Sequence, residues 1–253
     1  ATRSAEWVVV AELVVSLVLA HLLLHRTLAP RAWAIVRAGA DRWRTIDWRA
    51  AGVLLLVALL GFALTYADRW GAATALDARQ FANYAFAGTI VAIGLSTQSL
   101  VNASVYPMLA RLYARSGQAA CFELCARLSI GGLLGSLLLA VPAYFALEYA
   151  IGRWYPAYGI APMLVAPFLV VAAFRVSEFW SSYLVIVGYQ GRLLRTNLLA
   201  GAGAALAWIV AVQAAGNART PGGFAWLALA LAVIGYAAVA WGAMRTSRTE
   251  SRS

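Results

Sequence analysis

The feature that most constrains this chain is a series of seven apolar blocks that are almost free of charged residues. They cover residues 7–24, 51–66, 84–106, 128–147, 160–187, 197–215 and 224–244. About 20 consecutive apolar residues are needed for an α-helix to cross the hydrocarbon core of a bilayer. With 63% hydrophobic and 12% charged residues, the chain lacks the polar surface that a water-soluble domain requires. The blocks therefore predict a polytopic membrane protein.

The spans are predicted to be helices rather than strands. Backbone groups in lipid must be hydrogen-bonded inside the spanning structure, so helices and closed barrels are the two solutions. Barrel strands alternate in polarity over about ten residues, whereas these blocks are continuously apolar. The predicted fold class is all-α, a polytopic transmembrane helical bundle of seven spans. Bends are expected at the prolines in or next to the blocks, which are Pro107, Pro142, Pro162 and Pro167. Close contacts between helices are expected at the glycines Gly131, Gly132, Gly135, Gly201 and Gly203.

The distribution of arginine predicts how the chain is oriented. All 20 basic residues are arginine, and the segments between the blocks hold fourteen of them on one side of the membrane and five on the other. Basic residues accumulate in cytoplasmic loops, so the N-terminus is expected outside and the C-terminus in the cytoplasm. Because topology accounts for the net charge of +10, no nucleic-acid partner is expected.

The longest segment between blocks, residues 25–49, carries three tryptophans among its arginines. This pattern predicts a short amphipathic helix on the cytoplasmic surface, held by aromatic rings and by anionic membrane lipid. The alternative is a solvated linker.

Three acidic or basic residues other than histidine lie inside the blocks: Glu12, Arg175 and Glu178. A charge in a span costs roughly 2.5–3.5 kcal/mol, so such residues face a cavity or pair with one another. Arg175 and Glu178 are three positions apart, and two interpretations stay open. They form an ion pair along one helix, or Arg175 binds an anionic group in a central cavity while Glu178 tunes it. Glu12 is a candidate coupling site for a proton or cation, although its shallow depth also lets it snorkel.

Further polar residues gather in the middle of the third block. They are Ser96, Thr97, Gln98 and Asn102, and Ser177 lies between Arg175 and Glu178. These side chains either line a cavity or form hydrogen bonds between helices. The candidate substrate-binding residues are Arg175, Glu178, Gln98 and Asn102. The sequence has no glycine-rich phosphate loop, no lysine and no serine elbow, so neither an enzyme activity nor a metal or other cofactor is expected.

Five short stretches resemble a known family, and their order and spacing carry the resemblance. They are Tyr-Ala-Asp-Arg at 66–69, Asn-Tyr-Ala-Phe-Ala at 83–87, Tyr-Pro-Met-Leu-Ala-Arg-Leu at 106–112, Gly-Arg-Trp-Tyr-Pro-Ala-Tyr at 152–158 and Gly-Tyr-Gln-Gly-Arg at 188–192. Over residues 50–240 the chain resembles the polysaccharide (O-antigen type) lipid-linked oligosaccharide flippases of the multidrug/oligosaccharidyl-lipid/polysaccharide exporter superfamily. Asn83 stands where that family usually has glycine.

The resemblance implies a division of the chain and a function. Such flippases have two six-helix lobes, so residues 1–24 resemble the last helix of the N-terminal lobe and 25–49 the basic loop between lobes. Residues 50–245 resemble the C-terminal lobe, and 246–253 a cytoplasmic tail. The implied function is movement of undecaprenyl-pyrophosphate-linked oligosaccharide across the bacterial inner membrane by alternating access. The implied partners are that lipid-linked oligosaccharide, the missing N-terminal lobe or a partner chain, and polysaccharide polymerase machinery.

Other functions remain open at this stage. Within the same superfamily, the open alternatives are a multidrug/cation antiporter and a peptidoglycan-precursor flippase, because the basic interlobe loop fits all three. A membrane-embedded glycan transferase or acyltransferase would use a border carboxylate, for which the outer loops offer Asp68, Asp77 and Glu148. A lone half also fits a scaffold that does not transport.

Overall fold

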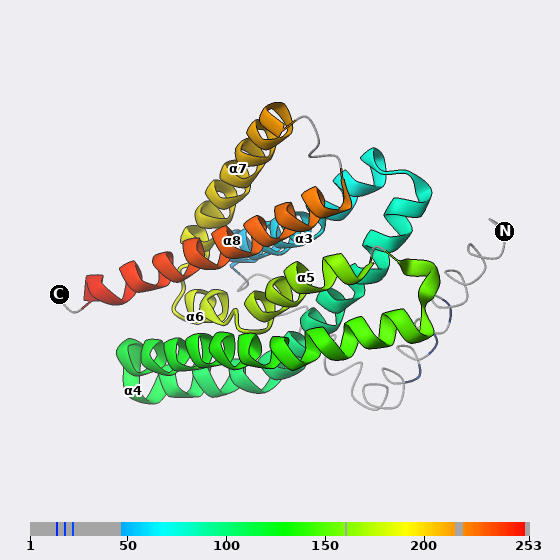
Figure 1. The fold of residues 1–253 in the computed structure, drawn as a ribbon. Helices are drawn as coiled ribbons and strands as arrows, with labels where there is room; N and C mark the ends of the chain where they lie inside the picture. The colour runs from blue at the N-terminus through cyan, green and yellow to red at the C-terminus, as the bar shows by residue number, and fades with distance from the viewer. Residues whose placement is uncertain are drawn as a thin grey trace. The chain divides into compact units, whose positions relative to one another are not determined.

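The computed structural model describes residues 47–159, 161–215 and 220–250, together with Val14, Val18 and Leu22. The chain divides into two compact units, Ala1–Arg49 and Ala50–Ser253. In the first unit the described residues are all exposed, and all but Asp47 are helical: Val14, Val18, Leu22, Asp47, Trp48 and Arg49. Apart from the first two residues of α3, the second unit holds the helices labelled in Figure 1, which are α3 (Trp48–Ala75), α4 (Ala78–Trp154), the 3-10 helix η2 (Pro156–Tyr158), α5 (Ala161–Val176), α6 (Trp180–Ile186), α7 (Gln190–Ala215) and α8 (Pro221–Glu250).

The predicted all-α class is confirmed over the described residues, which contain no strand. In the part of the chain that the structure describes, five helices are long and apolar enough to cross a membrane, with α5 and α6 counted together. The blocks at 51–66, 197–215 and 224–244 lie within α3, α7 and α8, and α8 continues to Glu250, so the expected tail begins as helix. The block at 7–24 and most of the segment at 25–49 lie outside the described residues. The total of seven spans therefore stays a prediction.

Helix α4 consists of two arms that fold back on each other at Gly117. This residue has φ 80° and ψ −173°, a backbone conformation that is essentially restricted to glycine. Beyond it the chain reverses, as Figure 1 shows, and the Cys121 thiol donates to the Leu109 carbonyl at 3.6 Å. The arms contain the third and fourth predicted spans. The prolines at 107 and 142 lie inside the arms, and the helix continues through both.

Polar residues mark where two of these helices start. The Asp77 carboxylate accepts a hydrogen bond from the Gln80 backbone N–H at 2.8 Å and caps α4. The Thr220 hydroxyl accepts from the Gly223 N–H at 3.1 Å before α8, whose first residue is Pro221. Proline suits that position because it has no N–H to leave unpaired.

The buried apolar residues form two clusters at opposite ends of the second unit. One cluster gathers around Tyr84, whose ring meets Phe168 and Phe224 edge-on at 5.3 and 6.2 Å between ring centroids. The other lies by the turn of the α4 hairpin and includes Leu109, Cys121, Cys125, Tyr183, Leu184 and Leu193. The helices thus pack tightly at both ends, and the candidate site lies between them.

Glycine lets some of these helices approach closely. A Cβ on Gly94 would lie 2.9 Å from the Ala172 Cβ, and a Cβ on Gly201 would lie 2.7 Å from Leu64 Cδ2. Gly132 lies against Ser177. Close contact is therefore found at two of the five predicted glycines, Gly132 and Gly201. The prediction is wrong for Gly131, Gly135 and Gly203, where an added Cβ would meet nothing within 4 Å.

The outside of the unit is apolar. The most apolar windows of α3 and α4 have no buried residue, and Leu100, Leu138 and Leu199 are 74–75% exposed. A soluble monomer rarely exposes so large an apolar surface. Such a surface is suited to contact with lipid, in agreement with a membrane protein.

Candidate functional site

The site begins with a break in the fifth predicted span. Helix α5 ends at Val176 and α6 begins at Trp180, so residues 177–179 are not helical. Two backbone carbonyls in the break are satisfied by the α4 hairpin. Gln98 Nε2 donates to the Glu178 carbonyl at 3.1 Å, and the Cys125 thiol donates to the Phe179 carbonyl at 3.3 Å. Because unpaired backbone groups are costly inside a membrane, these side chains stabilise the break.

The carboxylate of Glu178 caps the helix that follows it. Its Oε1 accepts from the Ser181 N–H and its Oε2 from the Ser181 hydroxyl, each at 3.0 Å. Both oxygens therefore have donors on α6, in the manner of an N-terminal helix cap. This arrangement leaves Glu178 committed to the local fold.

A break in the helix lies between Arg175 and Glu178. They do not lie on one continuous helix, as the interpretation of an intrahelical ion pair requires, because α5 ends between them. Among the described residues, Arg127 and Glu123 form an ion pair within 4.0 Å, and Arg175 and Glu178 do not. The buried Nε of Arg175 has no hydrogen-bond partner. The intrahelical ion pair is therefore not formed in this structure, although the two opposite charges still attract each other across the break. A buried guanidinium nitrogen without a hydrogen-bond partner is costly, which makes Arg175 a candidate for binding an external anion.

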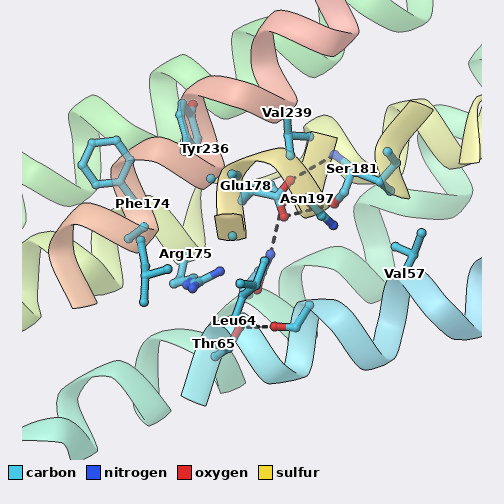
Figure 2. Close-up of a pocket in the computed structure, with 18 of the residues that line it drawn as sticks. Val57, Leu64, Thr65, Phe174, Arg175, Glu178, Ser181, Asn197, Tyr236 and Val239 are labelled. Atoms are coloured by element: carbon cyan, nitrogen blue, oxygen red, sulfur yellow. Dashed lines mark hydrogen bonds between the residues drawn. The ribbon is translucent and has the colours of Figure 1, made fainter. Parts of the chain in front are cut away.

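Arg175 and Glu178 line one cavity of about 240 Å³. Figure 2 shows their side chains between α3, which carries Leu64 and Thr65, and α8, which carries Tyr236. Helices α3 to α8 all contribute to the wall, which includes Val57, Gly61, Leu95, Gln98, Phe174, Leu193, Ala200, Gly201, Leu231, Ala232, Gly235 and Val239. The cavity is apolar over most of its wall and carries a few convergent polar groups, as ligand pockets do.

The remaining candidates divide between the cavity and other roles. Gln98 lines the cavity, whereas Asn102 accepts a hydrogen bond from the Ser182 hydroxyl at 3.0 Å and joins two helices. Ser96 and Thr97 are exposed and donate to carbonyls of their own helix. Ser177 is buried and donates to Ala173. Glu12 lies outside the described residues.

Four polar residues of the cavity wall were not predicted: Thr65, Ser181, Asn197 and Tyr236. Asn197 is the most informative because α7 aims its amide into the cavity near Glu178, as Figure 2 shows. In the sequence it marks the border of a span, and no local pattern distinguishes a border amide from one that faces a cavity.

A second, smaller cavity of about 10 Å³ links Arg175 to the motif at 66–69. Asp68 and Arg69 line it together with Arg175. The Tyr84 hydroxyl donates to the buried Asp68 carboxylate, and Arg69 donates to the Gly88 carbonyl at 2.8 Å. The stretches 66–69 and 83–87 therefore meet in space and hold α3 against α4.

Comparison with known proteins adds no relative to this description. No family model, no curated protein and no solved structure matches the chain.

Proposed function

We propose that this chain is the membrane component of a transporter that binds the phosphate-bearing head of a lipid-linked oligosaccharide and moves it across the bilayer. The observation that carries the proposal is Arg175, which forms no ion pair within 4.0 Å among the described residues, has a buried Nε without a hydrogen-bond partner, and faces a cavity bounded by six helices. Guanidinium presents a planar set of donors that matches phosphate oxygens. The resemblance of the motifs supplies the cargo class, an undecaprenyl-pyrophosphate-linked oligosaccharide.

The same observation ranks the alternatives. A multidrug/cation antiporter needs acceptors and negative charge for its cargo, but the carboxylate in this cavity, Glu178, is occupied by Ser181. A glycan transferase needs an available border carboxylate. The Asp68 carboxylate accepts a hydrogen bond from Tyr84, and the Asp77 carboxylate caps α4. Of the three candidate carboxylates, the exposed Glu148 is then the one still available for catalysis. The anion-binding transporter therefore fits the cavity best.

Alternating access requires two lobes that rock about a shared site. We propose that residues 50–245 act as one lobe in the bacterial inner membrane, with a second lobe supplied by the same protein or by a partner chain. The arginines support an orientation with the hairpin turn in the cytoplasm, because more of them lie at the end of the unit that holds this turn. That end carries Arg111, Arg115, Arg192, Arg195 and Arg245, and the opposite end carries Arg69, Arg79 and Arg153.

The test replaces Arg175 with glutamine in the cells that carry the gene, with Arg153→Gln as the control because Arg153 is exposed and outside the cavity. Membrane levels are checked, and lipid-linked oligosaccharide is then labelled separately on each leaflet. We expect Arg175→Gln to leave the protein in the membrane and the oligosaccharide on the inner leaflet, while Arg153→Gln delivers normally. Loss of a charged hydrogen bond to phosphate, about 1.5–3 kcal/mol, predicts roughly 10- to 100-fold slower delivery.

Two outcomes would count against the proposal. Unchanged delivery by Arg175→Gln would mean that Arg175 does not bind the cargo. Unchanged delivery after deletion of the whole gene would remove the flippase assignment itself.

A further inference from the structure

Two adjoining hollows on the outside of the α4 hairpin form a second candidate site. Their volumes are about 430 and 380 Å³, and they share Arg127 and Gly131. We call them together the hairpin groove. The remaining lining is mostly apolar and consists of Phe122, Glu123, Ala126, Ile130 and Leu134 in the first hollow, and Val101, Leu128, Gly132, Val176 and Phe179 in the second.

The groove is hollow at Gly131 because this residue has no side chain. A Cβ built there would meet no atom within 4 Å, so a larger residue would occupy the groove without disturbing the helix packing. Ile130 and Leu134 beside it are 52% and 64% exposed. The groove is therefore open to whatever surrounds the hairpin, which in a bilayer is lipid.

Charge marks one end of the groove. Arg127 lies toward the turn of the hairpin, and the apolar residues Ile130 and Leu134 follow it toward the middle of the arm. Its partner is Glu123, but both side chains are largely exposed, at 74% and 64%, and exposed ion pairs contribute little. Residues 107–127 carry Arg111, Arg115 and Arg127 against the single acid Glu123. This end of the hairpin therefore attracts anions.

We propose that the hairpin groove binds an anionic glycerophospholipid of the surrounding membrane. The phosphate meets the guanidinium of Arg127 in place of Glu123, and one acyl chain lies along Gly131 toward Leu134. The order of groups in the groove, a cation followed by an apolar track, matches the order of head and chain in the lipid. The inference is independent of the cargo proposed for Arg175.

The position of the groove gives this lipid a second contact. Val176 and Phe179 line the groove, while their neighbours Arg175 and Glu178 line the cavity. An acyl chain of the lipid that entered the second hollow would therefore pack against the back of the helix break whose front forms the candidate transport site.

The experiment uses the purified full chain in detergent, titrated with phosphatidylglycerol or with phosphatidylcholine of the same acyl chains, and counts bound lipids by native mass spectrometry. Both lipids carry a phosphate, but the choline group neutralises it in one of them. An arginine near the bilayer surface contributes about 1 kcal/mol to anionic lipid binding, so we expect about fivefold tighter binding of phosphatidylglycerol.

Four variants test the geometry. Arg127→Gln and Gly131→Leu are expected to abolish the preference, and Glu123→Gln to increase it because the competing carboxylate is removed. Gly135→Leu is the matched control, since Gly135 lies on the same arm, faces open space and does not line the groove. Helix content by circular dichroism confirms that each variant is folded.

The proposal is overturned if the native chain binds both lipids equally. It is also overturned if Arg127→Gln retains the preference, or if Gly131→Leu and Gly135→Leu behave alike.

Discussion

At the scale of single residues, the hydrogen bond from Tyr84 to Asp68 is the contact whose loss should be most costly. Both side chains are buried, with 0% and 4% exposure. Tyr84→Phe keeps the ring contacts and leaves a buried carboxylate with one donor fewer. The expected loss of unfolding free energy is about 1–3 kcal/mol, measured as a lower Tm of the purified protein in detergent.

The control for Tyr84→Phe is Tyr149→Phe on the same helix, because Tyr149 is 68% exposed and should lose no stability. A double-mutant cycle with Asp68→Asn then isolates the pair. Equal Tm values for the two tyrosine variants would show that the bond with Asp68 contributes nothing.

Residues of this kind show how far the sequence alone predicts the site. Arg175, Glu178 and Gln98 were predicted as candidates because charge or amide inside an apolar block is unusual, and all three line one cavity. The bond between Asp68 and Tyr84 and the cavity position of Asn197 depend on how α3, α4 and α7 pack. Spacing along the chain does not determine that packing. For the same reason the sequence did not distinguish Asn102, which was predicted to bind substrate but accepts a hydrogen bond from Ser182 on another helix.

At the scale of elements, the hairpin turn of α4 depends on one backbone conformation. Gly117→Ala places a Cβ at φ 80° and ψ −173°, which should lower the unfolding free energy by about 1–3 kcal/mol. Gly135→Ala should act in the opposite direction and add up to about 1 kcal/mol, because it replaces a helical glycine that faces open space. Chemical unfolding in detergent measures both, and a shift of the same sign in the two variants would contradict a special role for Gly117.

The helices also show which interruptions of a span can be predicted from the sequence and which cannot. The positions of the predicted spans at residues 51–66, 84–106 and 128–147 agree with α3 and the arms of α4 because length and apolarity determine them. The break at 177–179 contains neither proline nor glycine, while Pro107 and Pro142 end no helix. The break persists because Gln98 and Cys125, some 80 and 54 positions away, bond its carbonyls. Local sequence carries no signal of such distant partners.

At the scale of the whole molecule, the described part of the second unit has two packed ends, a cavity with a few polar groups between them, and an apolar outer surface. Both clusters of buried residues exclude polar ligands, so the cavity between them is where the proposed anionic cargo would meet Arg175. The small cavity volume of about 240 Å³ suits a head group better than a whole oligosaccharide. In the proposed transporter, the rest of the cargo would then occupy the space between this lobe and the second one.

The environment of that apolar surface is tested by placing a charge on it at two depths. Leu138 lies near the middle of the second arm of α4 and is 74% exposed, and Trp154 lies at its end and is 68% exposed. In water both substitutions by arginine would change stability by less than about 0.5 kcal/mol. In a bilayer Leu138→Arg should cost about 2.5–3.5 kcal/mol of insertion free energy, whereas Trp154→Arg reaches the polar interface and costs much less. The fraction of each variant that resists alkaline extraction from membranes distinguishes the two environments, and equal fractions would place the exposed face of α4 outside the hydrocarbon.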